Sequence, residues 1–310
     1  MSDAWLPDDL TVQAFDALHD DLPAWRGAIT TLAAKLGSSG VEQVSEGTVL
    51  VALLDADRVL KLYPPFLRDH CLFERAALRH LQGRLGLPTP LLLGSGEHRD
   101  WPYTLMSRLP GEVLTPLWPG WPEPSRLTLL RSLGELTVQV QALTGPGLPE
   151  LVRLAPAWPD FLAQQRQRCL ARQQRTGLPP HLLQQVEAFL PAESVTELSA
   201  GPWVMLTGEY TPMNLLVQNE RLSGMFDFGD GLVGPREYDW LGPLCFLAAG
   251  NADRCLAYLS ACGAVLDDAL RLRLMRLLLL HRYSHLPAQL ALPGWQQQPD
   301  FLSLARALWP

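Results

Sequence analysis

Hydrophobic and polar positions follow two different patterns along this chain. In the first third, short runs rich in Val and Leu are separated by turns containing Gly, Asp and Ser, which is typical of strands. Beyond Pro110-Gly111, apolar residues recur at intervals of three and four over long stretches, which is typical of helices. The pattern therefore predicts a sheet-containing N-terminal lobe over residues 1–106 and a mostly helical C-terminal lobe over residues 107–310.

The elements expected in each lobe follow from these patterns and from the turn residues between them. The N-terminal lobe begins with a helical lead-in that ends before Gly37. Its predicted strands occupy residues 41–44, 48–54, 58–63, 91–94 and 103–107, with one long helix at 66–85. The predicted helices of the C-terminal lobe occupy residues 124–144, 158–176, 180–190, 239–262 and 266–286, and two short strands lie within 204–230. The fold class is therefore α+β, and the cleft between the lobes is the expected ligand site.

A lysine and a glutamate occupy positions where apolar residues are expected. Side chains alternate along the predicted strand at 58–63, so Lys61 shares a face with Val59 and Tyr63. The helix that follows has an apolar stripe with a gap at Glu74, the members of the stripe being Leu67, Cys71, Leu78 and Leu81. Because a buried carboxylate is costly unless it is paired, Glu74 is either the partner of Lys61 or a solvated residue at the edge of the stripe. A Lys–Glu pair would aim the ammonium at a nucleotide phosphate.

The turn between the first two strands is a second candidate for phosphate binding. Gly47, followed by Thr48, would let backbone N–H groups approach an anion. The alternative is an ordinary turn between strands.

Three oxygen-bearing side chains are expected to meet at the end of a hairpin. Residues 215–217 and 225–226 read as its two strands, and a turn centred on positions 220 and 221 would place Asn214 opposite Asp227. Carboxylate and amide oxygens suit Mg²⁺. Glu209 precedes Asn214 in a loop and could point to the same place, although such residues near turns are also common caps and turn formers.

Composition and charge narrow the classes of partner. The chain of 310 residues has 25 Lys and Arg against 32 Asp and Glu, a formal net charge of −7. An acidic protein is a poor candidate for non-specific binding to nucleic acid or anionic membranes, so we expect neither partner. The five cysteines are scattered without a C-x-x-C pair, and the N-terminus lacks a secretory pattern, so a cytoplasmic location is expected. The sequence leaves the oligomeric state open.

Several short segments, taken together, resemble the aminoglycoside phosphotransferase family of small-molecule kinases. T-G-E-Y-T-P-M-N at 207–214, D-F-G-D at 227–230 and G-P-R-E-Y-D at 234–239 are similar to the catalytic region of the family. V-L-K-L at 59–62 and Y-T-L-M-S-R-L-P-G at 103–111 resemble its lysine strand and the connector between its lobes. The resemblance covers roughly residues 35–290 and implies a protein-kinase-like bilobal fold.

The resemblance also implies roles for residues in the nucleotide site. Lys61 would contact the phosphates of ATP, with Glu74 holding the lysine in place. Asn214 and Asp227 would bind Mg²⁺. The turn residues Gly47 and Thr48 would cover the phosphates, and the backbone of the connector would hold the adenine at Met106, Ser107 and Arg108.

For the second substrate, the resemblance implies a hydroxyl-bearing small molecule. Glu209 would accept the proton of the hydroxyl, Asp230 and Glu237 would face the acceptor, and Asp239 would hold the catalytic loop. The acidic net charge favours a cationic acceptor such as an aminoglycoside, with homoserine, choline or a sugar-like metabolite as alternatives.

Two positions depart from the family pattern. Thr207 replaces the usual His, and Glu209 replaces the usual Asp. The extra methylene of Glu209 moves the carboxylate by about 1 Å, and a misplacement of that size can cost on the order of 10²-fold in rate. The sequence therefore supports either an active phosphotransferase whose loop compensates or a nucleotide-binding pseudokinase.

Overall fold

An antiparallel sheet forms the centre of the N-terminal lobe. The computed structural model describes residues 6–7, 10–45 and 48–310. The strands of the sheet are β1 (Val41–Ser45), β2 (Leu50–Leu54), β3 (Arg58–Leu62), β4 (Leu92–His98) and β5 (Trp101–Ser107). Their spatial order is β1-β2-β3-β5-β4, and all neighbours pair antiparallel. We refer to the elements up to β5 as the N-terminal lobe and to the later elements as the C-terminal lobe.

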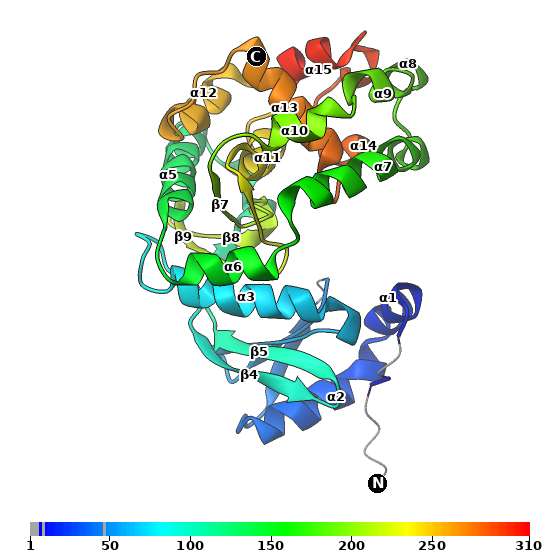
Figure 1. Ribbon diagram of the computed structural model, residues 1–310. Helices are drawn as coiled ribbons and strands as arrows, with labels where there is room; N and C mark the ends of the chain where they lie inside the picture. The colour runs from blue at the N-terminus through cyan, green and yellow to red at the C-terminus, as the bar shows by residue number, and fades with distance from the viewer. Residues whose placement is uncertain (1–5, 8–9, 46–47) are drawn as a thin grey trace.

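Helices cover both faces of this sheet. Leu60 and Leu62 of β3 are buried with residues of α1 (Val12–Asp20) and α2 (Leu22–Lys35), so these two helices close one face. On the other face, α3 (Arg68–Leu81) follows the short 3₁₀ turn η1 (Pro65–Leu67) and lies between the sheet and the C-terminal lobe (Figure 1). One side of α3 belongs to the core of the C-terminal lobe, so this helix connects the two lobes.

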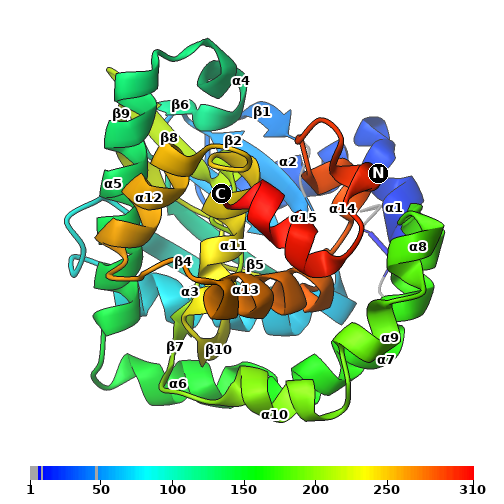
Figure 2. The same ribbon diagram turned by 90° about the horizontal axis from the view of Figure 1, so that it is seen from above.

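The C-terminal lobe is mostly helical. Its helices are α4 (Leu114–Leu117), α5 (Glu123–Ala142), α6 (Gly147–Leu154), α7 (Trp158–Thr176), α8 (Pro180–Leu183), α9 (Val186–Phe189), α10 (Glu193–Ser199), α11 (Glu237–Phe246), α12 (Ala252–Ala261), α13 (Asp268–Leu280), α14 (Leu286–Gln289) and α15 (Phe301–Leu308). Three 3₁₀ turns accompany them, η2 (Trp118–Gly120), η3 (Pro212–Asn214) and η4 (Trp295–Gln297). Seen from above, α11 and α13 lie centrally, with α5 and α12 on one side, α7 to α9 on the other, and α6 and α10 along the lower edge (Figure 2).

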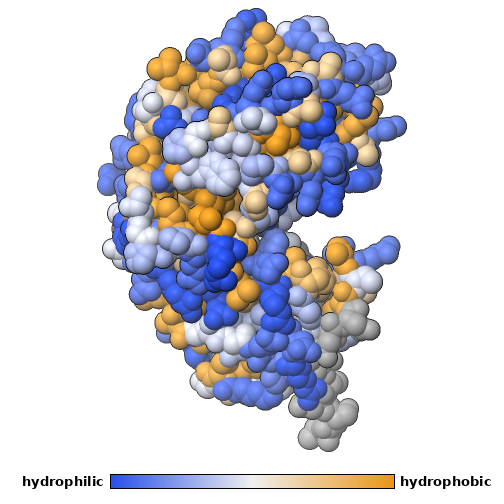
Figure 3. Space-filling model, viewed as in Figure 1, coloured by the Kyte–Doolittle hydropathy of each residue, from blue (hydrophilic) through white to orange (hydrophobic). Residues whose placement is uncertain are grey.

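Short strands in the C-terminal lobe border the segments that contain Glu209, Asn214 and Asp227. Strand β7 (Trp203–Leu206) pairs with β10 (Leu232–Pro235), and β8 (Leu215–Gln218) pairs with both β6 (Glu112–Val113) and β9 (Arg221–Met225). The surface is deeply indented between the two lobes (Figure 3). In the part of the chain that the structure describes, no helix combines the length and hydrophobicity needed to cross a membrane.

The predicted fold class is confirmed, and the element boundaries differ where local breaks interrupt the pattern. The lead-in divides into two helices at Asp21, and the helix predicted at 66–85 ends at Leu81. The helix predicted at 239–262 divides into α11 and α12 around Gly250, which has a left-handed φ of 73°. The helix predicted at 180–190 divides into α8 and α9, and the helices α4, α6, α10 and α15 were not predicted.

Candidate active site

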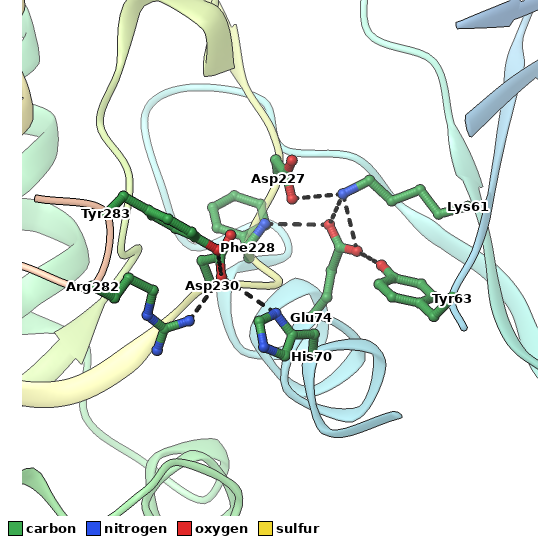
Figure 4. Close-up of polar contacts among 9 residues, drawn as sticks. All are labelled: Lys61, Tyr63, His70, Glu74, Asp227, Phe228, Asp230, Arg282 and Tyr283. Carbon is green, nitrogen blue, oxygen red and sulfur yellow. Dashed lines mark hydrogen bonds and ion pairs between the residues drawn. The ribbon is translucent and has the colours of Figure 1, made fainter. Parts of the chain in front are cut away.

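The ammonium of Lys61 lies between two carboxylates that come from different lobes. Its Nζ is 2.9 and 3.2 Å from the two carboxylate oxygens of Glu74 on α3, and 2.6 Å from Oδ1 of Asp227 (Figure 4). Alternation along β3 produces this arrangement, because Leu60 and Leu62 turn toward α2 while Lys61 turns toward α3. Burial alone would lower the pKa of Lys61, but the charges of Asp227 and Glu74 outweigh it and raise the pKa. Lys61 therefore remains a cation although it is buried.

Glu74 is fully buried, and hydrogen-bond donors compensate the negative charge of its carboxylate. Besides Lys61, the hydroxyl of Tyr63 and the backbone N–H of Phe228 donate to its carboxylate, the latter at 3.2 Å. Burial raises the pKa of Glu74, and Lys61 opposes that shift. Tyr63 was not predicted as a site residue, although its place on the same strand face as Lys61 was the signal that could have found it.

A buried aspartate fixes the loop that carries Glu209. Asp239 on α11 accepts the N–H groups of Thr207 and Gly208 at 2.8 and 3.0 Å. Burial raises the pKa of Asp239 to about 7, against the opposing effect of these donors. Gly208 has a left-handed φ of 85°, and a Cβ there would lie 2.2 Å from the carbonyl oxygen of Asp230. A larger residue therefore does not fit at position 208.

Glu209 is half-buried, at the place where two cavities meet. Burial raises its pKa to about 7, and the nearby charges of Asp230 and Asp227 act in the same direction, while Arg282 opposes them. A carboxyl group with a pKa near the working pH is suited to accept and release a proton.

The hairpin brings Asn214 close to Asp227, but the predicted pairing is wrong by one residue. The turn consists of Asn219 and Glu220, both with left-handed φ, and a bulge shifts the register between Leu216 and Val217. The backbone N–H of Phe226 donates to the carbonyl of Asn214 at 3.1 Å, so Phe226 and not Asp227 lies opposite Asn214. Asp227 follows with a φ of 68°, which directs its carboxylate toward Lys61.

The donor set near Asp227 fits a magnesium ion that is held mostly by phosphate oxygens. The side-chain amide nitrogen of Asn214 donates to the carbonyl of Glu209 at 3.2 Å, which leaves its side-chain oxygen for a ligand. The Asp227 side chain is 38% exposed and so accessible to an ion. Within the described residues, no group of three or more His, Cys, Asp and Glu side chains could hold a metal ion without other ligands. One carboxylate and one amide match the protein share of a typical Mg²⁺–nucleotide site.

A cleft of about 490 Å³ between the lobes contains most of the predicted nucleotide residues. Its lining includes Thr48, Lys61, Met106, Ser107, Arg108, Glu209, Asn214 and Asp227. The N–H groups of Ser107 and Arg108 already donate to Leu91 and Asp57 at 2.9 and 2.7 Å, so these two donors are not free for a base. Gly47 lies outside the described residues.

A second pocket of about 180 Å³ lies beyond Glu209, within the C-terminal lobe. Glu209 and Met213 line both this pocket and the nucleotide cleft. Glu209 thus lies between the interlobe cleft and the second pocket.

The two residues predicted to face the acceptor are engaged elsewhere. Oδ1 of Asp230 lies 2.7 Å from Arg282 Nη1, 2.8 Å from the hydroxyl of Tyr283 and 3.3 Å from Nδ1 of His70 on α3 (Figure 4). Burial would raise the pKa of Asp230, but His70, Arg282 and Tyr283 outweigh it and hold the pKa below its ordinary value. Glu237 pairs with Arg273 at 3.4 Å. Neither residue lines the second pocket.

Comparison with known proteins adds fold-level matches. No curated protein sequence matches the chain significantly. Among solved structures, wild-type aminoglycoside 2'-phosphotransferase-IIIa in its GDP complex is 17% identical, with a TM-score of 0.66, covering 90% of this chain and 96% of the other. Macrolide 2'-phosphotransferase MphH from Brachybacterium faecium is 21% identical, with a TM-score of 0.60, covering 91% and 98%. Aminoglycoside phosphotransferase APH(3'')-Id from Streptomyces rimosus is 15% identical, with a TM-score of 0.61, covering 83% and 98%.

The family itself is shown by sequence. The profile of the phosphotransferase enzyme family matches residues 40–274, which include the whole nucleotide cleft and the loop of Glu209. Together with the lysine held between two carboxylates, this match establishes that the chain belongs to the phosphotransferase enzyme family, a family of ATP-dependent small-molecule kinases.

Proposed function

We propose that this protein transfers the γ-phosphoryl group of ATP to a hydroxyl of a small molecule, with Glu209 as the proton acceptor. The observation that carries this proposal is the position of Glu209, which lines both the interlobe cleft containing Lys61 and Asp227 and the separate pocket beyond it. Phosphoryl transfer depends mainly on positioning and on neutralising charge, and these residues provide for both.

Lys61 supplies a fixed positive charge toward the phosphates. Glu74 holds the ammonium in place, since its own carboxylate is anchored by Tyr63 and by the backbone of Phe228. This anchoring keeps the side chain of Lys61 in one orientation, so little reorganisation is needed when a phosphate approaches.

Asp227 and Asn214 would hold the magnesium ion. A bound Mg²⁺ would neutralise charge on the phosphates. Lys61 donates to Oδ1 of Asp227 at 2.6 Å, so the lysine fixes the orientation of this carboxylate.

Glu209 would orient the acceptor hydroxyl and take its proton. Asp239 holds the backbone immediately before Glu209 through two N–H groups, and the Glu209 carbonyl accepts the amide of Asn214. The loop is thus fixed on both sides of the longer side chain, which supports an active enzyme despite the departure at this position. Thr207 also donates its hydroxyl to Asp239 at 3.3 Å.

Two observations indicate the class of the acceptor, the names of the matched structures and the residues that line the second pocket. The matched structures are named as aminoglycoside and macrolide phosphotransferases, so both antibiotic classes are candidates for this chain. The net charge of the chain favours the cationic aminoglycosides, whereas the residues that line the second pocket favour the macrolides.

The test measures acceptor-dependent ADP release with Mg·ATP, using the wild type, Glu209→Gln and Asp227→Asn. Glu187→Gln, at an exposed position on α9, is the matched control. We expect turnover by the wild type and the control and a large loss in the other two variants. If Mg·ATP raises the melting temperature but no aminoglycoside or macrolide elicits ADP release, phosphoryl transfer to these classes is refuted and nucleotide binding alone remains.

A further inference from the structure

Exposed hydrophobic side chains from three parts of the chain converge on the pocket beyond Glu209. Met213 of η3 is 57% exposed, Phe246 of α11 is 38% exposed, and Tyr283, after α13, is 41% exposed. Single exposed hydrophobic residues are ordinary, but several that gather at one concave site mark a surface for an apolar ligand. Leu241 and Leu278 continue the lining of the same pocket.

The pocket offers few negative charges to a cationic ligand. Two carboxylates line it, and one of them, Asp239, is buried and occupied by the N–H groups of Thr207 and Gly208. The nearby Asp230 is already neutralised by Arg282, and Glu237 by Arg273. This leaves Glu209, which cannot pair with several ammonium groups at once.

The imidazole in the pocket does not change this balance. His281 stacks on Tyr238 with ring centroids 4.7 Å apart, and its Nδ1 accepts the backbone N–H of Tyr283 at 3.3 Å. Burial and the neighbouring charge of Arg282 together lower the pKa of His281 to about 4, so the ring is neutral at pH 7. The lining therefore combines one accessible carboxylate, that of Glu209, with neutral and apolar groups.

We propose that the acceptor presents its reactive hydroxyl beside an apolar face and carries at most one positive charge, and that Met213, Phe246 and Tyr283 select it. A polycationic acceptor would have to bury ammonium groups against methionine and aromatic side chains without partners, which is costly. An amphipathic acceptor instead removes the three exposed hydrophobic side chains from water. This inference rests on the proposed function, because it assigns the second pocket to the phosphorylated substrate.

The experiment compares two acceptors of opposite character. Erythromycin, a macrolide with a large apolar ring and a single amine, is compared with kanamycin, which carries several amines. The readouts are kcat/KM from ADP release and binding in the presence of Mg·ADP. We expect kcat/KM for erythromycin to exceed that for kanamycin by about tenfold or more.

Substitutions in the pocket identify the residues that select the acceptor. Phe246→Asp adds a carboxylate at the pocket and should lower the erythromycin-to-kanamycin ratio of kcat/KM by about tenfold. Phe66→Asp is the matched control, since Phe66 is a phenylalanine of similar exposure, 40%, in the N-terminal lobe, and it should leave the ratio unchanged. Met213→Glu, at a more exposed position, provides the same test if Phe246→Asp does not fold.

Three results would overturn the inference. They are a wild-type preference for kanamycin or none at all, failure of both compounds to bind, and an unchanged ratio in both pocket variants. The proposed function is decided separately, by whether Mg·ATP stabilises the wild type but not Asp227→Asn and by whether any acceptor elicits ADP release. A wild-type preference for kanamycin would thus refute the apolar acceptor and support the phosphotransferase.

Discussion

Nζ of Lys61 lies 2.6 Å from Oδ1 of Asp227, which is 166 positions later in the chain. This contact joins the residue proposed to bind phosphate to the residue proposed to bind metal, and it crosses from one lobe to the other. Since Lys61 also contacts Glu74, the loss of the Asp227 charge leaves the lysine paired.

Asp227→Asn should therefore fold and yet lose metal-dependent nucleotide binding. Asn has the same shape and tolerates a left-handed backbone, so the melting temperature without ligand should change little. We expect the stabilisation by Mg·ATP to fall and kcat/KM to drop by on the order of 10²-fold or more. Thermal shift with Mg·ATP, compared with ATP plus EDTA, measures the first effect. An unchanged magnesium-dependent shift would contradict the proposed role.

The buried pair of Lys61 and Glu74 makes a different prediction, about stability. Lys61→Met removes one partner and leaves a buried carboxylate without its counter-charge, which should cost about 3–5 kcal/mol of unfolding free energy. Combining it with Glu74→Gln removes that charge and keeps an acceptor for Tyr63 and Phe228. The double variant should be more stable than Lys61→Met alone and equally inactive. Urea unfolding of the wild type, of Lys61→Met, of Glu74→Gln and of the double variant tests this. If the losses of unfolding free energy in the single variants add up in the double variant, the two residues are not coupled.

The raised pKa of Glu209 predicts the pH dependence of the rate. If the carboxylate is the proton acceptor, kcat/KM should rise with pH through about 7 and then level off. Glu209→Gln should be slower by on the order of 10²- to 10⁴-fold and lack that rise. A wild-type rise near the ordinary glutamate pKa, or the same profile in both proteins, would count against this role.

The raised pKa of Glu209 also predicts how stability depends on pH. The stability should fall as the pH rises, whereas the rate should increase. The folded-state pKa of about 7 lies above the ordinary glutamate value of 4.5, so between these pH values the folded state binds more protons than the unfolded state. The stability contributed by Glu209 is present below pH 4.5 and is lost as the pH rises through about 7. Glu209→Gln should thus gain in melting temperature relative to the wild type between pH 5 and 8. A constant difference would exclude this linkage.

The length of the side chain at position 209 can be tested directly. If the loop is built for glutamate, Glu209→Asp withdraws the carboxylate by about 1 Å and should slow turnover by on the order of 10²-fold. Faster turnover by Glu209→Asp would show instead that the glutamate is misplaced and the wild type is a weakened enzyme.

Gly208 should be irreplaceable for two separable reasons. Alanine there would be strained by the φ of 85° and would meet the Asp230 carbonyl oxygen at 2.2 Å. Gly177 has the same φ of 85° with nothing within 4 Å, so Gly177→Ala measures backbone strain alone. We expect Gly177→Ala to cost about 1–3 kcal/mol and Gly208→Ala clearly more, with loss of activity. Equal losses in the two variants would show that the loop moves to accommodate the Cβ.

The sequence predicted those parts of the fold and site that depend on local periodicity. Alternation along β3 and the gap in the apolar stripe of α3 led to Lys61 and Glu74, which the structure places in contact. The hairpin was predicted, but its register was not, because the turn lies at Asn219 and Glu220, one residue earlier than expected, and a bulge between Leu216 and Val217 shifts the pairing again.

Contacts that depend on the packing of distant elements could not be predicted from the sequence. Asp230 was expected to face the acceptor because of its place in a motif, whereas Arg282 and Tyr283 reach it from a segment about fifty positions away. Nothing in the local pattern marks these two residues. The same holds for Met213 and Phe246, which look like ordinary surface residues until the fold brings them to one pocket.

The four residues from Asp227 to Asp230 contact the N-terminal lobe at three points, through Lys61, Glu74 and His70. Glu74 and His70 lie on α3, which is itself packed into the core of the C-terminal lobe. A change in the packing of α3 would therefore move the phosphate-binding cation relative to the metal-binding carboxylate.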